Sequence, residues 1–292
     1  MSRITNPDEI RRLIAQHDRW WHEIELAPGI VSPGDDTNRK KLPILDDLGL
    51  PNDLTGMKAL DVGCSDGFFS FELEKRGADV TAMDFVPATY TGFDIARRIL
   101  GSHVEYRVGN VYSLNPDDFG EYDIVFFLGV LYHLRRPQAA LDAIRSVMPV
   151  GGQLFVASFL IDEHVLLPDS SVTTLEALNP LLKEIPLWQA YRGGELNGDY
   201  TNCFAPNMKA LHVALEEASF RVESSTALPG AGFVRASAVS DPIAEKYQRL
   251  DTRIHESPLD PSVPYYLDEE GAVHDLTGRR PDNSSNPGRS KR

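Results

Sequence analysis

The chain has 292 residues, 42% of them hydrophobic, which is enough apolar material for one large domain or two small ones. No apolar run reaches the roughly 18–20 residues that a membrane span needs, and the polar start MSRITNPDEI lacks a signal-peptide core, so we expect a cytoplasmic protein without a membrane partner. Two cysteines argue against a disulfide framework or a cysteine zinc site, and a net charge of −14 disfavours nucleic acid as a partner.

The N-terminal segment carries the signals of an amphipathic helix. Asn6 can cap a helix, Pro7 suits its first position, and Glu9 stands where a capping box has its acid. Apolar residues then recur at helical spacing as far as Trp21. Prolines and glycines between residues 20 and 34 predict an irregular segment that lies against the main domain.

A strand–helix alternation begins after residue 56. Short apolar runs predict strands, and amphipathic segments between them, several followed by glycine, predict helices. The predicted strands are 57–63, 79–84, 104–108, 122–129 and 151–160, and the predicted helices are 68–77, 89–100 and 137–148. This rhythm predicts a Rossmann-like, doubly wound α/β fold with a mostly parallel sheet.

A helix at 206–220 and two strands at 221–228 and 232–239 close the pattern, which gives seven strands with an antiparallel final strand. Residues 161–205 interrupt it and predict an insert near the mouth of the site.

Three parts are therefore expected along the chain. They are an N-terminal helix and lid-like segment (1–56), a central domain (57–242) and a largely flexible C-terminal extension (243–292), with a short helix at 243–254. The sequence does not fix the oligomeric state, and a homodimer is one expectation.

A glycine-containing turn, LDVGCSDG at residues 60–67, connects the first predicted strand to the helix that follows it. Asp61 stands at the carboxyl end of the strand, and Gly63 and Gly67 let the backbone turn tightly and approach a ligand. Ligands of open parallel sheets bind at this edge, beside the point where the strand order reverses. The turn therefore predicts a ligand site.

Further candidate ligand contacts follow the next two predicted strands. Asp84 ends the second strand, where a carboxylate can accept hydrogen bonds from both hydroxyls of a ribose, and Met83 and Phe85 beside it can pack on an adenine. Asn110 and Val111 follow the third strand, where an amide and a backbone N–H can contact the adenine edge. Together with the turn, these residues favour an adenosine-containing ligand.

The glycine spacing indicates which kind of adenosine-containing ligand the turn binds. The spacing DxGxxxG differs from the GxGxxG of dinucleotide-binding turns, and no GK[ST] follows it. A sulfonium cofactor carries no phosphate, and its amino-acid end needs an acidic partner, which Asp61 can supply. The alternative is that the glycines serve only the turn.

The segments LDVGCSDGFFS, TAMDF and FFLGVLYHLRRP resemble the motifs of class I S-adenosylmethionine-dependent methyltransferases. With WWHEIELAPGIVSPG, the last of them is similar to the tRNA wobble-uridine methyl- and carboxymethyltransferase group and its relatives. The resemblance implies S-adenosylmethionine as cofactor. The residues expected at the cofactor are Asp61, Gly63, Cys64, Gly67, Asp84, Asn110, Val111 and Leu128.

The chain departs from the tRNA enzymes in lacking their long basic N-terminal extension and in being strongly acidic. It also lacks the basic and aromatic anchors expected for a carboxylated cofactor. We therefore expect O-methylation of a small polar acceptor, such as a sugar or short oligosaccharide. The alternatives are a tRNA wobble-uridine methyltransferase and a non-catalytic cofactor-binding module.

A hydroxyl acceptor must lose its proton, and a side chain with a pKa near neutrality suits that task. His133, in LGVLYH after the fourth strand, is the first candidate, and His22 in the N-terminal segment is the second. The alternative for His133 is a structural role, in which it caps the next helix or bonds a backbone carbonyl.

Aromatic residues and acids supply the remaining candidates. Acceptor contacts are expected from Trp21, Tyr132, Tyr191 and Tyr200, although packing or a polar surface loop would use the same residue types. Asp162 and Glu163, after the fifth strand, could orient hydroxyls or bind Mg²⁺, which accepts oxygen ligands, but no third ligand is in view.

Overall fold

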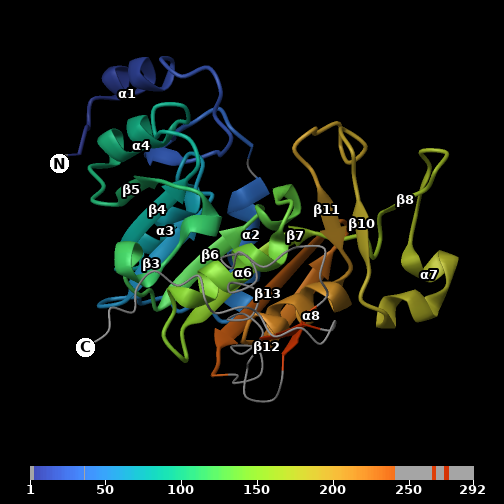
Figure 1. Ribbon diagram of the computed structural model, residues 1–292. Coiled ribbons are helices and arrows are strands. Elements are labelled where there is room, and N and C mark those ends of the chain that lie inside the picture. The colour runs from blue at the N-terminus through green and yellow to red at the C-terminus, as the bar shows by residue number, and fades with distance from the viewer. Residues whose placement is uncertain (1–2, 36, 241–264, 268–272, 276–292) are drawn as a thin grey trace, which may run out of the picture. The chain divides into compact units, whose positions relative to one another are not determined.

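The computed structural model describes residues 3–35, 37–240, 265–267 and 273–275 (Figure 1). Residues 1–240 form one compact unit and residues 241–292 a second. In the second unit, β14 (Tyr265–Leu267) and β15 (Val273–Asp275) pair antiparallel. The helix predicted at 243–254 and most of the predicted flexible extension lie outside the described residues.

A seven-stranded sheet organises residues 1–240, in the order β12-β13-β7-β6-β3-β4-β5. The five strands from β3 to β7 pair parallel to one another, whereas β13 runs antiparallel to both of its neighbours. This confirms the predicted Rossmann-like sheet with an antiparallel final strand. The strands are β3 (Lys58–Val62), β4 (Asp79–Asp84), β5 (Glu105–Val108), β6 (Ile124–Leu128), β7 (Gln153–Phe159), β12 (Phe220–Leu228) and β13 (Ala231–Ala238).

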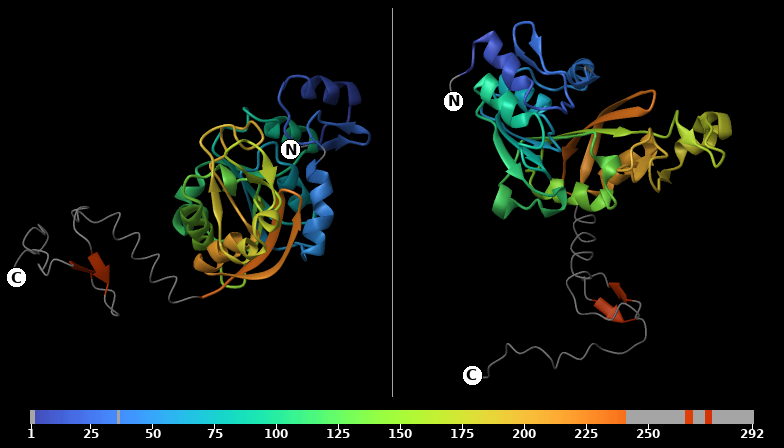
Figure 2. Two further views of the ribbon diagram at one scale, coloured as in Figure 1. Left: turned by 90° about the vertical axis from the view of Figure 1, so that its right-hand side faces the viewer. Right: turned by 90° about the horizontal axis from the view of Figure 1, so that it is seen from above.

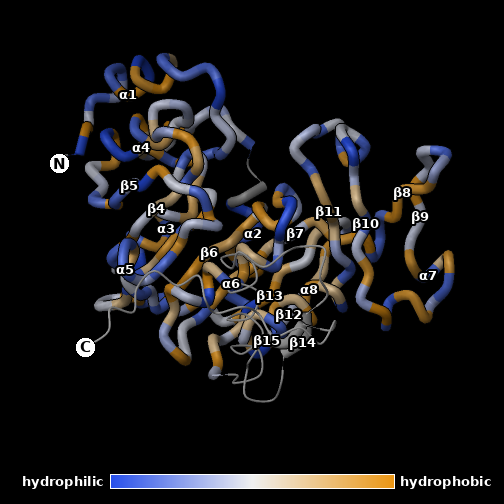
Figure 3. Tube along the Cα trace, viewed as in Figure 1, coloured by the Kyte–Doolittle hydropathy of each residue, from blue (hydrophilic) through white to orange (hydrophobic). Residues whose placement is uncertain are grey.

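Two apolar cores lie on the two faces of this sheet, and apolar residues concentrate in the central strands (Figure 3). Successive strand residues join opposite cores, as Ala82 and Met83 do, because side chains of a strand alternate between its faces. One core is covered by α3 (Phe68–Lys75) and α4 (Phe93–Leu100), and the other by α6 (Pro137–Ser146) and α8 (Met208–Glu217). The short helices are α5 (Pro116–Phe119), η1 (Val111–Ser113) and η2 (Leu131–His133).

The N-terminal segment packs into the first of these cores. Its helix α1 (Pro7–Ile14) has the predicted cap, since the Asn6 side chain accepts hydrogen bonds from the N–H groups of Asp8 and Glu9. The helix ends well before Trp21, however, because the Trp20 indole N–H donates to the carbonyl of Ile14 and the chain turns there. Trp20, with Ile10, Leu13, Ile24 and Leu26, is buried in the core.

Two elements of the N-terminal region were not predicted. A hairpin of β1 (Glu25–Ala27) and β2 (Ile30–Val31) lies within the segment expected to be irregular. Helix α2 (Thr37–Asp47) contains Pro43, which lacks a backbone donor and weakens a helical pattern. Burial of Leu45 in the core stabilises this helix despite its proline, and Leu48, directly after the helix, is buried there too.

The insert after β7 forms a small subdomain beside the sheet (Figure 2). It has its own apolar cluster, made of Ile161, Leu175, Tyr191, Leu196 and Ala205. Its elements are β8 (Val165–Leu166), β9 (Val172–Thr173), α7 (Leu175–Leu178), η3 (Pro180–Glu184), β10 (Trp188–Ala190) and β11 (Phe204–Pro206). No helix among the described residues is both long and apolar enough to cross a membrane.

Candidate functional site

The strand order reverses between β3 and β6, so the chain leaves these neighbouring strands in opposite directions along the sheet. Asp61 on β3 pairs with Ala82 of β4 on one side and with Phe126 of β6 on the other. The carboxyl ends of these parallel strands therefore meet around Asp61, at the place where open α/β sheets bind ligands. Every candidate cofactor residue lies on β3, β4 or β6, on the loop that follows β3 or β5, or at the start of η1.

Asp61 is a buried acid that the Ser70 side chain contacts. Its side chain accepts a hydrogen bond of 2.6 Å from the Ser70 hydroxyl, and the residue is 3% exposed. Burial raises the pKa of Asp61 to about 7, and the nearby Asp84 carboxylate adds to the rise. A cation beside Asp61 would therefore favour its ionised form.

The turn after β3 depends on its glycines. Gly63 has φ of +75°, and a Cβ there would lie 2.4 Å from the Val130 side chain. Gly67 has φ of +90°, and a Cβ there would lie 2.6 Å from the Phe93 ring. The N–H groups of Gly63 and Cys64 both donate to the carbonyl of Met83, which fastens the turn to β4. Any side chain at either glycine would be strained.

Asp84 holds the other side of the turn. One carboxylate oxygen accepts a 2.9 Å hydrogen bond from the Ser65 N–H, and the other accepts a 3.3 Å bond from the Val86 N–H. Each oxygen keeps acceptor capacity for a further donor, such as a ribose hydroxyl. Of its neighbours expected at an adenine, Met83 is buried in the core, whereas Phe85 is 78% exposed.

The remaining candidate cofactor residues line the ends of β5, β6 and the turn. The Asn110 side-chain oxygen caps η1 by accepting from the Tyr112 N–H, which leaves its amide N–H groups free for another acceptor. Val111 and Cys64 are buried, and Leu128 is half-buried at the end of β6. Burial raises the pKa of the Cys64 thiol, so it contributes apolar surface rather than charge.

An adenosyl sulfonium fits these residues. Among the residues that the structure describes, no Lys or Arg forms an ion pair with Asp61 or Asp84. Two neighbouring acids without a counter-cation favour a ligand that carries positive charge and hydroxyl donors. Asp61 could hold an ammonium group and Asp84 a ribose, with the glycine turn between them.

Asp66, which the sequence analysis missed, ties the turn to the N-terminal segment. One of its oxygens accepts hydrogen bonds from the backbone N–H groups of Trp21 and His22, and the other accepts from Gly92. The residue is 1% exposed, and burial raises its pKa. The only signal in the sequence was an acid between the two glycines of a turn.

His133 ends η2, which follows β6 at the same edge of the sheet. Its Nδ1 atom lies 2.8 Å from the Thr201 hydroxyl of the insert, and its ring centroid lies 4.2 Å from that of Tyr132. Burial lowers the pKa of His133, while the Asp199 carboxylate raises it. The imidazole is therefore positioned by a contact across 68 residues of chain rather than by a helix cap.

Comparisons with known proteins agree with this geometry. Residues 60–156, which contain the turn, Asp84 and His133, match the methyltransferase domain family. This segment is a methyltransferase domain. The match begins on β3 and ends within β7, so it spans the strands whose ends carry the candidate cofactor residues.

Curated relatives of the methyltransferase domain have different names. The ubiquinone biosynthesis O-methyltransferase of Marinobacter nauticus is 31% identical over 153 residues, which is 52% of this chain and 61% of the relative. The tRNA U34 carboxymethyltransferase of Campylobacter hominis is 32% identical over 142 residues, which is 47% of this chain and 50% of the relative. The chain thus spans between half and about three fifths of these relatives.

The fold extends beyond the methyltransferase domain. The N-terminal domain of EvdMO1, whose structure is described with S-adenosylhomocysteine and D-fucose, superposes with a TM-score of 0.55 at 17% identity. That match covers 82% of this chain and 100% of the other. A putative S-adenosylmethionine-dependent methyltransferase from Listeria monocytogenes has a TM-score of 0.52 at 14% identity, covering 70% of this chain and 100% of the other. At these identities the likeness establishes the fold.

The structure places the candidate acceptor residues around the methyltransferase domain in different environments. Trp21 and Tyr200 are 68% and 82% exposed, whereas Tyr191 is buried in the core of the insert. Tyr132 is half-buried beside His133. His22, in the N-terminal segment, is buried against Phe68 and Phe69 of α3.

The two candidate metal ligands have partners within the protein. Asp162 accepts a hydrogen bond from the Met208 N–H at the start of α8, and Glu163 lies 3.6 Å from the Lys183 ammonium. Within the described ranges, no cluster of three His, Cys, Asp or Glu side chains is arranged to hold a metal ion. The Asp162 carboxylate thus pairs with the first backbone N–H of α8, whose N-cap is Asn207.

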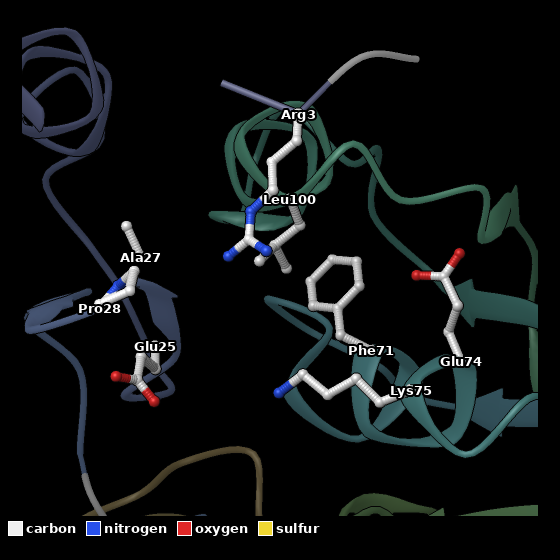
Figure 4. Close-up of a pocket in the computed structure, with 8 residues that line it drawn as sticks. All are labelled: Arg3, Glu25, Ala27, Pro28, Phe71, Glu74, Lys75 and Leu100. Carbon is white, nitrogen blue, oxygen red and sulfur yellow. The ribbon is translucent and has the colours of Figure 1, made fainter. Parts of the chain in front are cut away.

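A cavity of about 330 Å³ is lined by residues of the N-terminal segment and of helices α3 and α4 (Figure 4). Its lining includes Lys75 and Leu100, at the carboxyl ends of α3 and α4, together with Arg3 and Glu25. Because these helices run opposite to the strands they follow, the cavity lies toward the edge where the strands begin. It is separate from the cofactor edge of the methyltransferase domain.

Proposed function

We propose that this chain is an S-adenosylmethionine-dependent O-methyltransferase whose acceptor is a small polar molecule, such as a sugar or short oligosaccharide, and which acts in the cytoplasm. The observation that supports it most strongly is a pair of acids, Asp61 and Asp84, next to a histidine at the same sheet edge; no Lys or Arg of the described residues forms an ion pair with either acid. The match to the methyltransferase domain family supports the same reaction class.

In this proposal, the residues that bind the cofactor come from four strand ends. Asp61 holds its ammonium group, Asp84 its ribose hydroxyls, and Asn110 its adenine edge, while the glycine turn lets the backbone approach it. The cofactor residues are Asp61, Gly63, Cys64, Gly67, Asp84, Asn110, Val111 and Leu128. When bound, S-adenosylmethionine would supply an electrophilic methyl group and a sulfur leaving group that takes the electrons of the broken bond.

His133 takes the proton that the acceptor hydroxyl loses. Its pKa is lowered by burial, so at neutral pH the imidazole is uncharged and can accept a proton. The same burial argument makes His22 the less suitable base, because its pKa is lowered to about 3 and its side chain lies within the core. A group with so low a pKa accepts a proton weakly.

The acceptor is proposed to lie between the N-terminal segment and the insert. Trp21 and Tyr200 expose aromatic faces that can pack on a sugar ring, and Tyr132 shapes the site beside His133. Tyr191 contributes indirectly, because its ring packs inside the insert. The likeness of the fold to a domain described with D-fucose is consistent with a sugar acceptor.

The second candidate function is methylation of a tRNA wobble uridine. It is favoured by the similarity to a tRNA U34 carboxymethyltransferase and opposed by the net charge of −14. A nucleic-acid substrate would require binding that weakens steeply as salt is raised. The two candidates therefore differ in a simple measurement.

Transfer of labelled methyl groups from S-adenosylmethionine to a panel of glycosides, phenols and tRNA tests both candidates, with and without a chelator. We expect a labelled glycoside, and we expect His133→Ala to lower kcat by about 10²–10⁴-fold with unchanged affinity for S-adenosylhomocysteine. His103→Ala, at an exposed histidine, is the control. Label in tRNA alone would favour the second candidate, and no affinity for either cofactor form would refute both.

A further inference from the structure

We propose that Asp199 and Thr201 of the insert are positioning residues, which hold the proton of the His133 imidazole on Nδ1 and leave Nε2 as the proton-accepting atom. The inference deepens the proposed function, since it gives the insert a role in the reaction, and it rests on His133 being the base. It follows from which of the three side chains, Asp199, Thr201 and His133, can donate a hydrogen in the two hydrogen bonds that join them.

The Thr201 hydroxyl has two close neighbours and one proton. Its oxygen lies 2.6 Å from Oδ1 of Asp199 and 2.8 Å from Nδ1 of His133. The pKa of Asp199 is lowered by its hydrogen bonds to Thr201, so its carboxylate is ionised and can only accept. The hydroxyl therefore donates to Asp199 and must accept from His133. That contact requires a hydrogen on Nδ1, which leaves the lone pair of the neutral ring on Nε2.

Backbone contacts fix the insert against η2 at this position. The Cys203 N–H donates a 2.8 Å hydrogen bond to the carbonyl of Tyr132, and the Cys203 thiol lies 3.4 Å from the carbonyl of His133. The Thr201 N–H also donates to Asp199 at 2.8 Å, which fixes the carboxylate relative to the hydroxyl. The contacts among Asp199, Thr201 and His133 are thus held by the same chain segment that packs the insert against η2.

In the described part of the chain, three ionisable groups lie around His133. Tyr132 from η2 and Asp199 and Cys203 from the insert are the titratable groups in the contacts described around His133. Asp199 is the charged one, and its carboxylate raises the pKa of His133 against the effect of burial. Removal of Asp199 should therefore move the pH profile of turnover as well as the tautomer.

A second Asp–hydroxyl pair in the insert provides a matched control. Asp169 accepts hydrogen bonds from the Ser171 hydroxyl at 2.6 Å and from the Ser171 N–H at 3.0 Å, the same arrangement as Asp199 and Thr201. No histidine adjoins that pair among the hydrogen bonds of the described chain. Ser171→Ala and Asp169→Ala therefore remove an equivalent hydrogen-bonded turn and leave Asp199, Thr201 and His133 unchanged.

The tautomer can be measured by ¹⁵N NMR on protein without cofactor or acceptor, with His133→Gln to assign the signals. We expect the Nδ1–H form in the unchanged protein and in Thr201→Ser, and a mixture in Thr201→Val and Asp199→Ala. An Nε2–H form in the unchanged protein, or the same tautomer in Thr201→Val, would overturn the proposal. Because no turnover is needed, this result is independent of whether the proposed reaction is right.

Kinetics then test the link to the reaction. We expect Thr201→Val to lower kcat roughly tenfold, less than the ~10⁴-fold that a fully reversed tautomer costs a histidine base, while KM for the cofactor stays unchanged. Thr201→Ser should restore turnover, and Asp199→Ala should move the acidic limb of kcat/KM to lower pH. If Ser171→Ala lowered kcat as much as Thr201→Val, or if the acidic limb of kcat/KM did not move in Asp199→Ala, Asp199 and Thr201 would have only a structural role.

Discussion

The backbone N–H of His22 donates a 2.8 Å hydrogen bond to the carboxylate of Asp66, across 44 residues of chain. The same carboxylate binds the N–H groups of Trp21 and Gly92, so one buried acid connects the N-terminal segment, the glycine turn and the loop before α4. The Trp20 ring packs closely on the same loop: a Cβ at Gly92 would lie 2.3 Å from the ring. The N-terminal segment, which the sequence predicts to be lid-like, is therefore hydrogen-bonded to the glycine turn of the candidate site.

Asp66→Ala should destabilise the protein and disturb the cofactor turn. Three backbone donors lose their acceptor, and a buried unsatisfied donor costs about 1–3 kcal/mol, so we expect the free energy of unfolding to fall by about 3 kcal/mol or more. Urea unfolding measures this change. Asp53→Ala, which removes an exposed acceptor of the Thr55 N–H, should change it much less. Equal effects would show that Asp66 is an ordinary turn residue.

Asp84→Ala should weaken binding of S-adenosylhomocysteine with little effect on the sheet. A hydrogen bond to a charged group contributes about 1.5–3 kcal/mol, so we expect affinity to fall about tenfold or more by calorimetry. The control is Asp79→Ala, an exposed acid at the other end of the same strand. Unchanged affinity in Asp84→Ala would remove the ribose assignment.

Cofactor binding should release protons from Asp61 near neutral pH. The pKa of this carboxyl is about 7 in the free protein, and an ammonium group beside it favours the ionised form. Affinity should therefore rise as pH increases from 6 to 8, with release of roughly half a proton per site at pH 7. Calorimetry in buffers of different ionisation enthalpy measures the release. Asp61→Asn should abolish it, and undiminished release in that variant would contradict the assignment.

His22 should make the protein less stable in acid. Its pKa is lowered to about 3 by burial and by Lys41, whereas in the unfolded chain the imidazole takes up the proton near the ordinary histidine pKa of about 6.5. Stability is therefore lost as pH falls below that value, by about 2 kcal/mol at pH 5. Urea unfolding at pH 7.5 and pH 5 should show a smaller loss in His22→Gln than in the control His103→Gln. Identical losses would mean that His22 does not titrate in this way.

Several elements of the fold could be predicted because their signals are local. Strand β4 has the predicted bounds, the Asn6 cap forms as expected, and Gly101 ends α4 in a left-handed conformation. Caps, glycine stops and the period of apolar residues act over one or two turns of chain, so the sequence itself displays them. Helix α2 was missed because Pro43 interrupts the pattern and its stability comes from distant core contacts.

The sequence by itself determined the order of strands and helices, the glycine turn and the acids at the strand ends, because these depend on neighbours along the chain. Only the tertiary structure decided which side chains meet. It buried His22, set Asp66 against the N-terminal segment, and brought Thr201 to His133. Such contacts join residues more than 40 positions apart, so they depend on how the core packs and on which backbone donors burial leaves to be paired.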